Sequence, residues 1–213
     1  MRLPTLGALA LVALVAIVFW RSQLFSVSRP GEHPRALALR PPAARTRVDL
    51  DVVLPVVPGG LREVRGGEGV LLIHYWAMWE RDGRSQAVAL DSLRRLEAPA
   101  GLAVLAVCFD PMPSVARFVG RNRLRLPVLI DVAQDLSRAL PCPSIPYTYV
   151  LDASGRIAVS QAGEVDWLSP ATRAALDTLL REGTGLERVL RGRSGGAADS
   201  TARPRDADHR PSE

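Results

Sequence analysis

Cys108 and Cys142 are the only thiols in this 213-residue chain, and they stand 34 positions apart. This spacing matches neither a Cys-x-x-Cys redox pair nor a zinc motif. Cys108 lies within an apolar run, which favours a buried and inert thiol. Cys142 lies in Pro-Cys-Pro, where a lone reactive thiol is an alternative. A structural disulfide between the two is a further alternative in an oxidising compartment.

A second group of reactive side chains follows the apolar run at 70–76. Glu80 and Asp82 come directly after Trp76-Ala-Met-Trp79, where a helix is expected to begin. Acidic side chains are favoured there because the helix dipole and the free N–H groups attract negative charge. A metal site built from His74, Glu80 and Asp82 is a weaker alternative, and we predict no metal. His74 is expected to be a core or capping histidine.

The apolar pattern around these residues predicts alternating strands and helices. Continuous apolar strands indicate a sheet covered on both faces, and a hairpin around Asp152–Gly155 adds antiparallel strands to it. Ser169 and Pro170 are typical of the start of a last helix. The fold class is therefore α/β with a mixed sheet. Strands are predicted at 52–57, 61–64, 70–76, 103–110, 128–130, 147–151 and 156–161, and helices at 84–97, 114–122, 135–140 and 170–181.

These elements, together with several short segments, resemble the TlpA/ResA group of membrane-anchored thioredoxin-like proteins. The segments are Trp-Ala-x-Trp at 76–79, the strand at 104–110, the passage at 118–129, Ile-Pro-Tyr-Thr at 145–148 with its following strand, and the closing turn at 163–170. The resemblance implies a thioredoxin-like fold over residues 49–182, with a mixed central sheet flanked by helices on both faces. It also implies an N-terminal transmembrane helix and a cis bond before Pro146.

The resembled proteins place Cys-x-x-Cys after Trp-Ala-x-Trp, and here Glu80 and Gly83 stand at those two positions. A thiolate is the attacking group in thiol–disulfide exchange, and neither a carboxylate nor a glycine replaces it. The family's proline segment presents backbone to an extended substrate beside this motif. We therefore expect a binding groove, although the tryptophans could equally be packing residues. The expected groove residues are Trp76, Trp79, Ile145, Pro146 and Tyr147.

The two ends of the chain are expected to lie outside the folded domain. Residues 3–20 carry no charge and would span roughly 27 Å as a helix, which is close to the thickness of a bilayer core. We assign 1–21 to a membrane anchor, 22–48 to a Pro/Arg-rich linker and 183–213 to a disordered tail. A cleaved signal peptide ending near Ser26-Val27-Ser28 is the alternative.

The charge distribution argues against nucleic-acid binding. The chain has a net charge of +5, but residues 46–182 contain 15 Arg against 16 acidic residues, so the folded part is nearly neutral. Arg121, Arg123 and Arg125 form a small cluster, either solvated or facing an acidic partner. Arg21, Arg29 and Arg35 follow the anchor, which by the positive-inside rule would favour a cytoplasmic domain. The resemblance implies the opposite, a periplasmic domain on a single-pass bacterial inner-membrane anchor.

The sequence thus predicts a membrane-anchored protein that binds a protein or peptide without dithiol chemistry and without a cofactor. The resemblance implies partners from envelope thiol handling or cytochrome c maturation, with the bilayer as the anchor's environment. The alternative is a divergent thiol–disulfide oxidoreductase acting through Cys142. A third interpretation is a structural membrane subunit in which the groove has no function.

Overall fold

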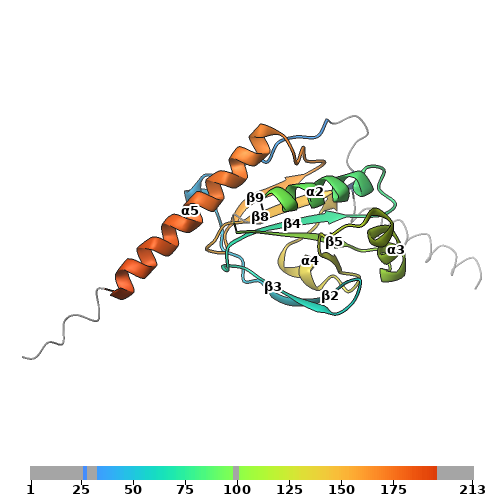
Figure 1. The fold of residues 1–213 in the computed structure, drawn as a ribbon, viewed down its shortest axis with the longest axis horizontal. Helices are drawn as coiled ribbons and strands as arrows, with labels where there is room; N and C mark the ends of the chain where they lie inside the picture. Colours follow the sequence, from blue (N-terminus) through green and yellow to red (C-terminus); the bar gives the residue numbers. More distant parts are fainter. Residues whose placement is uncertain (1–25, 28–32, 98–100, 196–213) are drawn as a thin grey trace, which may run out of the picture.

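The computed structural model describes residues 26–27, 33–97 and 101–195, and Figure 1 shows how they are arranged. Nine strands, one short 3-10 helix and four α-helices occur in these ranges. In chain order they are β1 Ser26–Val27, η1 Pro42–Ala44, β2 Asp51–Val57, β3 Leu61–Arg65, β4 Val70–Trp76, α2 Gly83–Glu97, β5 Leu102–Cys108, α3 Met112–Asn122, β6 Val128–Ile130, α4 Asp135–Ala139, β7 Ser144–Ile145, β8 Tyr147–Leu151, β9 Ile157–Ala162 and α5 Pro170–Gly195.

Seven of the strands form one central sheet in the order β3-β2-β6-β5-β4-β8-β9. Strands β4, β5 and β6 run parallel to one another. Strand β2 is antiparallel to β6, and β8 is antiparallel to both β4 and β9. The predicted mixed sheet is confirmed, and each predicted strand lies within one or two residues of its observed position.

Apolar side chains cover both faces of this sheet. On one face, α2, α3 and α5 contribute residues such as Leu90, Val115 and Leu176. On the other face, α4 contributes Leu136. Helices therefore lie on both faces, as the α/β prediction requires.

Strand β4 lies near the middle of the sheet, and all seven of its side chains are buried. Successive side chains of a strand point to opposite faces. Accordingly, Trp76 packs in the layer with α2, and Tyr75 packs in the layer with α4. The turn that precedes α2 therefore begins where the buried strand β4 ends.

The segment at 33–48 differs from the predicted linker because it packs on the domain. Leu37 is buried in the core, and the Ala38 N–H donates to Gln161 Oε1 at 3.0 Å. The buried Arg45 guanidinium forms ion pairs with Asp152 at 3.2 Å and Glu182 at 2.5 Å. Hydrogen bonding to Glu182 raises the pKa of Arg45. A leucine and a paired arginine therefore fix a segment whose proline content suggested a spacer.

The carboxyl end also differs from the prediction. Helix α5 begins as expected, with the Thr172 N–H donating to Ser169 Oγ at 3.2 Å. It continues to Gly195 instead of ending near Arg181, so the first part of the predicted tail is helical. No proline occurs between Pro170 and Pro204 to stop it.

The predicted anchor at 1–21 lies outside the described residues, as does 196–213 of the predicted tail. Within the ranges that are described, no helix has the length and apolar character needed to cross a membrane.

His74 is a core histidine, as predicted. Its Nδ1 shares a hydrogen bond with Thr148 Oγ1 at 3.0 Å, and its ring meets the Trp167 ring edge-on at 5.1 Å. Burial lowers the pKa of His74 from 6.5 to about 3. The folded protein therefore holds this imidazole neutral over a pH range in which the unfolded chain protonates it.

We expect acid to destabilise the protein through His74. Between pH 6.5 and 4.5 the unfolded chain binds a proton that the folded chain excludes, so the free energy of unfolding falls by roughly 2 kcal/mol from this group. His74→Asn keeps a hydrogen-bonding partner for Thr148 but does not titrate. Denaturant unfolding of both proteins at each pH should show a difference in stability that changes by this amount, and parallel curves would contradict the assignment.

Candidate functional site

The candidate site is built on the turn at 77–82, which joins the end of β4 to the start of α2. Glu80 is only 7% exposed, and its Oε2 accepts the Asp82 N–H at 3.1 Å. A Cβ at Gly83 would lie 2.5 Å from the carbonyl oxygen of Ala77. A cysteine at position 83 would therefore force the turn to shift. The turn is shaped around a carboxylate and a glycine.

The two tryptophans of this region have different environments. Trp79 is 55% exposed, whereas Trp76 is fully buried in the core. Trp76 belongs to β4, whose two faces are both covered, while Trp79 lies in the turn outside the sheet. The prediction that Trp76 lines a groove is therefore wrong, and Trp79 is the tryptophan that a partner can reach.

The proline segment is confirmed as a cis-Pro turn, because the Ile145–Pro146 bond is cis; Val57–Pro58 is a second cis bond that we did not predict. The side chains of Ile145 and Pro146 are buried and do not line a groove, which corrects the prediction. Tyr147 is half-buried, with its hydroxyl 2.8 Å from Ser160 Oγ. At residues 145–147, a partner would therefore contact the backbone and not the side chains of Ile145 and Pro146.

The backbone of β7 already pairs with an extended segment of the same chain. Strand β1 lies parallel to β7, with Ser26 opposite Ser144 and Val27 opposite Ile145. Together they form a separate two-stranded sheet. The sequence did not predict β1, because two paired residues leave no periodic pattern.

Both cysteine thiols are free. Cys108 is buried in the layer with α2, and its S–H donates to Asp110 Oδ2 at 3.3 Å. Cys142 packs against the opposite layer, and its S–H donates to the Ser144 carbonyl at 3.1 Å. Burial raises the pKa of both thiols, that of Cys142 to about 12. Because the sheet separates the two cysteines, the alternative of a disulfide between them is wrong.

Three carboxylates lie together beside the turn. Ligand atoms of Glu80, Asp82 and Glu164 are all within 4.8 Å of one another. Burial, followed by the charge of Asp82, raises the pKa of Glu164. Among the described residues this is the group whose geometry could hold a cation. His74 is not part of it, so the alternative of a His74, Glu80 and Asp82 site is not formed. Glu164 could not be linked to the turn from the sequence, because 84 positions separate it from Glu80.

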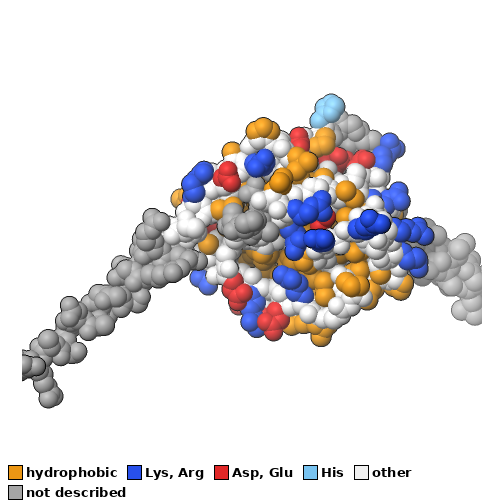
Figure 2. Space-filling model, in the orientation of Figure 1, with side chains coloured by type: hydrophobic (Ala, Val, Ile, Leu, Met, Phe, Trp, Pro, Cys, Tyr) orange, Lys and Arg blue, Asp and Glu red, His pale blue; other side chains and the backbone are white. Residues whose placement is uncertain are grey.

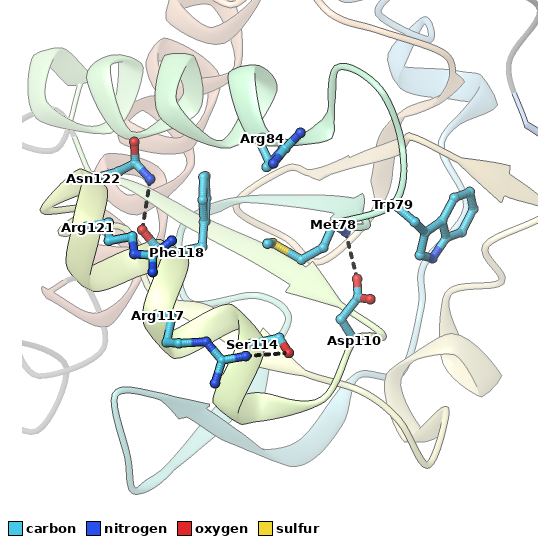
Figure 3. A pocket seen from close by; sticks show the side chains of 9 residues that line it. All are labelled: Met78, Trp79, Arg84, Asp110, Ser114, Arg117, Phe118, Arg121 and Asn122. Atoms are coloured by element: carbon cyan, nitrogen blue, oxygen red, sulfur yellow. Dashed lines mark hydrogen bonds between the residues drawn. The ribbon is translucent and has the colours of Figure 1, made fainter.

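A hollow of about 690 Å³ lies next to the turn, between α2 and α3 (Figure 3). We call it the basic hollow. Figure 2 shows arginine side chains gathered over this part of the surface. Of the predicted arginine cluster, Arg121 lines the hollow, while Arg123 ends α3 in a left-handed conformation. The residues that line it are Met78, Trp79, Arg84, Asp110, Ser114, Arg117, Phe118, Arg121 and Asn122.

Comparison with known proteins supports the fold. Residues 59–160 match the AhpC/TSA family. No curated protein matches the sequence. The chain has the thioredoxin-like α/β fold, as the resemblance implied.

Three crystal structures illustrate the structural similarity. A secreted thiol-disulfide isomerase from Corynebacterium glutamicum has a TM-score of 0.56 and 23% identity, with 74% of this chain and 97% of that chain covered. A DsbF homologue from Corynebacterium diphtheriae has a TM-score of 0.56 and 18% identity, with coverage of 74% and 98%. StoA from Bacillus subtilis has a TM-score of 0.52 and 16% identity, with coverage of 62% and 99%.

We expect both thiols to resist modification in the native protein. A rise in the pKa of Cys142 from 9.0 to about 12 lowers its thiolate fraction at pH 8 by roughly 1000-fold. Alkylation of the Cys108→Ser and Cys142→Ser variants, in buffer and in urea, measures each remaining thiol separately. Native rates should be at least about 100-fold slower than unfolded rates. Rapid alkylation of native Cys142 would contradict this and favour the oxidoreductase alternative.

Proposed function

We propose that this chain is a membrane-anchored thioredoxin-like domain that binds an extended segment of a partner protein without dithiol chemistry. The observation that carries the proposal is the position of the two thiols. Neither Cys108 nor Cys142 belongs to the turn at 77–82, and the two lie on opposite sides of the sheet. The turn presents Trp79 to solvent, with Glu80 and Gly83 beside it.

Two features of the surface support binding of an extended segment. The backbone of β7 pairs with Ser26–Val27, so this edge already accommodates an extended segment, and a partner strand could take the place of β1. Addition of a peptide strand to an exposed edge is a common recognition mode, in which main-chain hydrogen bonds supply affinity. Trp79 is a large exposed aromatic side chain, a residue type enriched at the energetic centres of protein interfaces.

The oxidoreductase alternative has less support. Thiol–disulfide exchange needs an accessible thiolate, and efficient attack requires a thiol pKa near the ambient pH. Cys142 has a pKa of about 12 and donates its S–H to a backbone carbonyl. Cys108, across the sheet, is not placed to resolve a mixed disulfide on Cys142.

The cellular setting is part of the proposal. We propose that residues 3–20 anchor the chain in the bacterial inner membrane and that the domain faces the periplasm. Its partners would then come from envelope thiol handling or cytochrome c maturation. A periplasm-only reporter fused to the carboxyl end tests the orientation. The third interpretation, a structural membrane subunit, makes a different prediction. Its partner would contact a surface away from Trp79.

We expect Trp79 to be required for partner capture. A photo-crosslinking residue at position 147 of the full chain, in its native cells, should give a discrete product whose attachment sites fall in one extended segment. Trp79→Ala should lower the yield about 30-fold, as expected for loss of a central interface tryptophan. Leu96→Ala is the matched control, because Leu96 is also 55% exposed. Equal cross-linking yields from the two variants would contradict a binding site at Trp79.

We also expect β1, at Ser26–Val27, to compete with a partner strand for pairing with β7. Proline has no N–H to donate, so the double substitution Ser26→Pro and Val27→Pro should weaken the pairing of β1 with β7. A partner strand would then find the edge free, and the cross-linking yield from position 147 should rise several-fold. A fall in yield would mean that the segment helps to form the site instead of occupying it.

A further inference from the structure

The basic hollow contains three arginines that converge from two helices. Arg84 lies in the first turn of α2, and Arg117 and Arg121 lie one helical turn apart on α3 (Figure 3). All three side chains are exposed. Phe118 lies between the arginines, and Trp79 lies at the end of the hollow nearest the turn. The hollow therefore combines a concentrated positive charge with aromatic surface.

These charges are not neutralised within the part of the chain that the structure describes. Arg84 and Arg121 form no ion pair or hydrogen bond there, and Arg117 donates only to Ser114 Oγ at 3.3 Å. Asp110 is the one carboxylate among the lining residues, and its Oδ2 already accepts the Met78 N–H at 2.7 Å. Elsewhere among the described residues, four arginines have carboxylate partners: Arg45, Arg65, Arg95 and Arg138.

An unpaired cluster of this kind is suited to an anion. Like charges one helical turn apart destabilise a helix slightly, and a bound anion removes that repulsion. The guanidinium group binds carboxylates in a bidentate manner, and it remains charged at any physiological pH. The aromatic surface beside the arginines favours a ligand that also carries an apolar group.

We propose that the basic hollow binds an acidic segment of a partner protein, with its carboxylates on Arg84, Arg117 and Arg121 and an apolar side chain against Trp79 and Phe118. The proposal rests on the proposed function, because it names the chemistry of that partner. A protein segment fits better than a small molecule because the hollow is open and its reachable residues are tryptophan and arginine. These residue types are enriched in protein interfaces.

The test uses the full chain in detergent and a labelled 14-residue peptide that contains four glutamates around one phenylalanine. Arg117→Gln and Arg121→Gln should each weaken binding by about tenfold, as expected for loss of one charge-assisted hydrogen bond. Arg125→Gln is the matched control, because it removes the same charge from an exposed residue that does not line the hollow. The peptide with glutamine in place of glutamate should bind at least tenfold more weakly.

Reversing the charge of both the site and the peptide gives the most specific test. The double variant Arg117→Glu and Arg121→Glu should lose the acidic peptide and bind a lysine version of it. Equal losses from Arg125→Gln, or equal binding of the glutamine peptide, would overturn the proposal. So would phosphatidylglycerol vesicles that bind as tightly with the same dependence on Arg117 and Arg121, since the site would then recognise a lipid surface.

The peptide-binding test of the basic hollow and the cross-linking test of the proposed function can fail independently. If the arginine variants bind the acidic peptide normally while cross-linking from position 147 persists, only the inference about the acidic segment fails. If cross-linking is absent and the peptide still binds, the hollow is an acidic-peptide site and the β7 edge is not.

Discussion

The complete burial of β4 is the constraint on which the rest of the structure depends. This strand lies between β5 and β8, so both of its edges are hydrogen-bonded and both of its faces must be covered. Helices α2, α3 and α5 cover one face and α4 covers the other. The buried apolar area is the main stabilising contribution. It also fixes where the chain leaves the core, at Trp76, and hence where the turn at 77–82 is presented.

The same sheet decides what the cysteines can do. Neighbouring strands bring Trp76 opposite Cys108, and both side chains point into the layer beneath α2. Cys142 follows α4 and packs on the other face, near Tyr75 and Asp131. A thiol on either face is desolvated, and desolvation disfavours the thiolate. Burial in two separate layers therefore accounts for two free thiols with raised pKa values in a fold whose structural relatives include thiol-disulfide enzymes.

The sequence predicts most of the fold because the strands and helices depend on local apolar periodicity, which is visible without a structure. It does not predict which side chains of the site reach solvent, because that depends on the tertiary arrangement of the turns. Trp76 and Trp79 are three residues apart and look equivalent, yet one ends a buried strand and the other lies in a turn. The acidic cluster and the basic hollow each join segments far apart in the chain, such as Glu80 with Glu164. The packing of residues 33–48 likewise depends on long-range partners of Leu37 and Arg45.

Acidic and basic side chains form separate groups around the turn. Glu80, Asp82 and Glu164 form one group of carboxylates, and Arg84, Arg117 and Arg121 line the hollow. Trp79 directly precedes Glu80 in the chain and also lines the hollow. A segment bound at Trp79 would therefore lie near both a basic and an acidic group. Complementary charge of this kind acts mainly on orientation and association rate. The domain is nearly neutral as a whole. This local separation of charge would favour one orientation of a bound segment, whereas backbone pairing along β7 alone would not select between orientations.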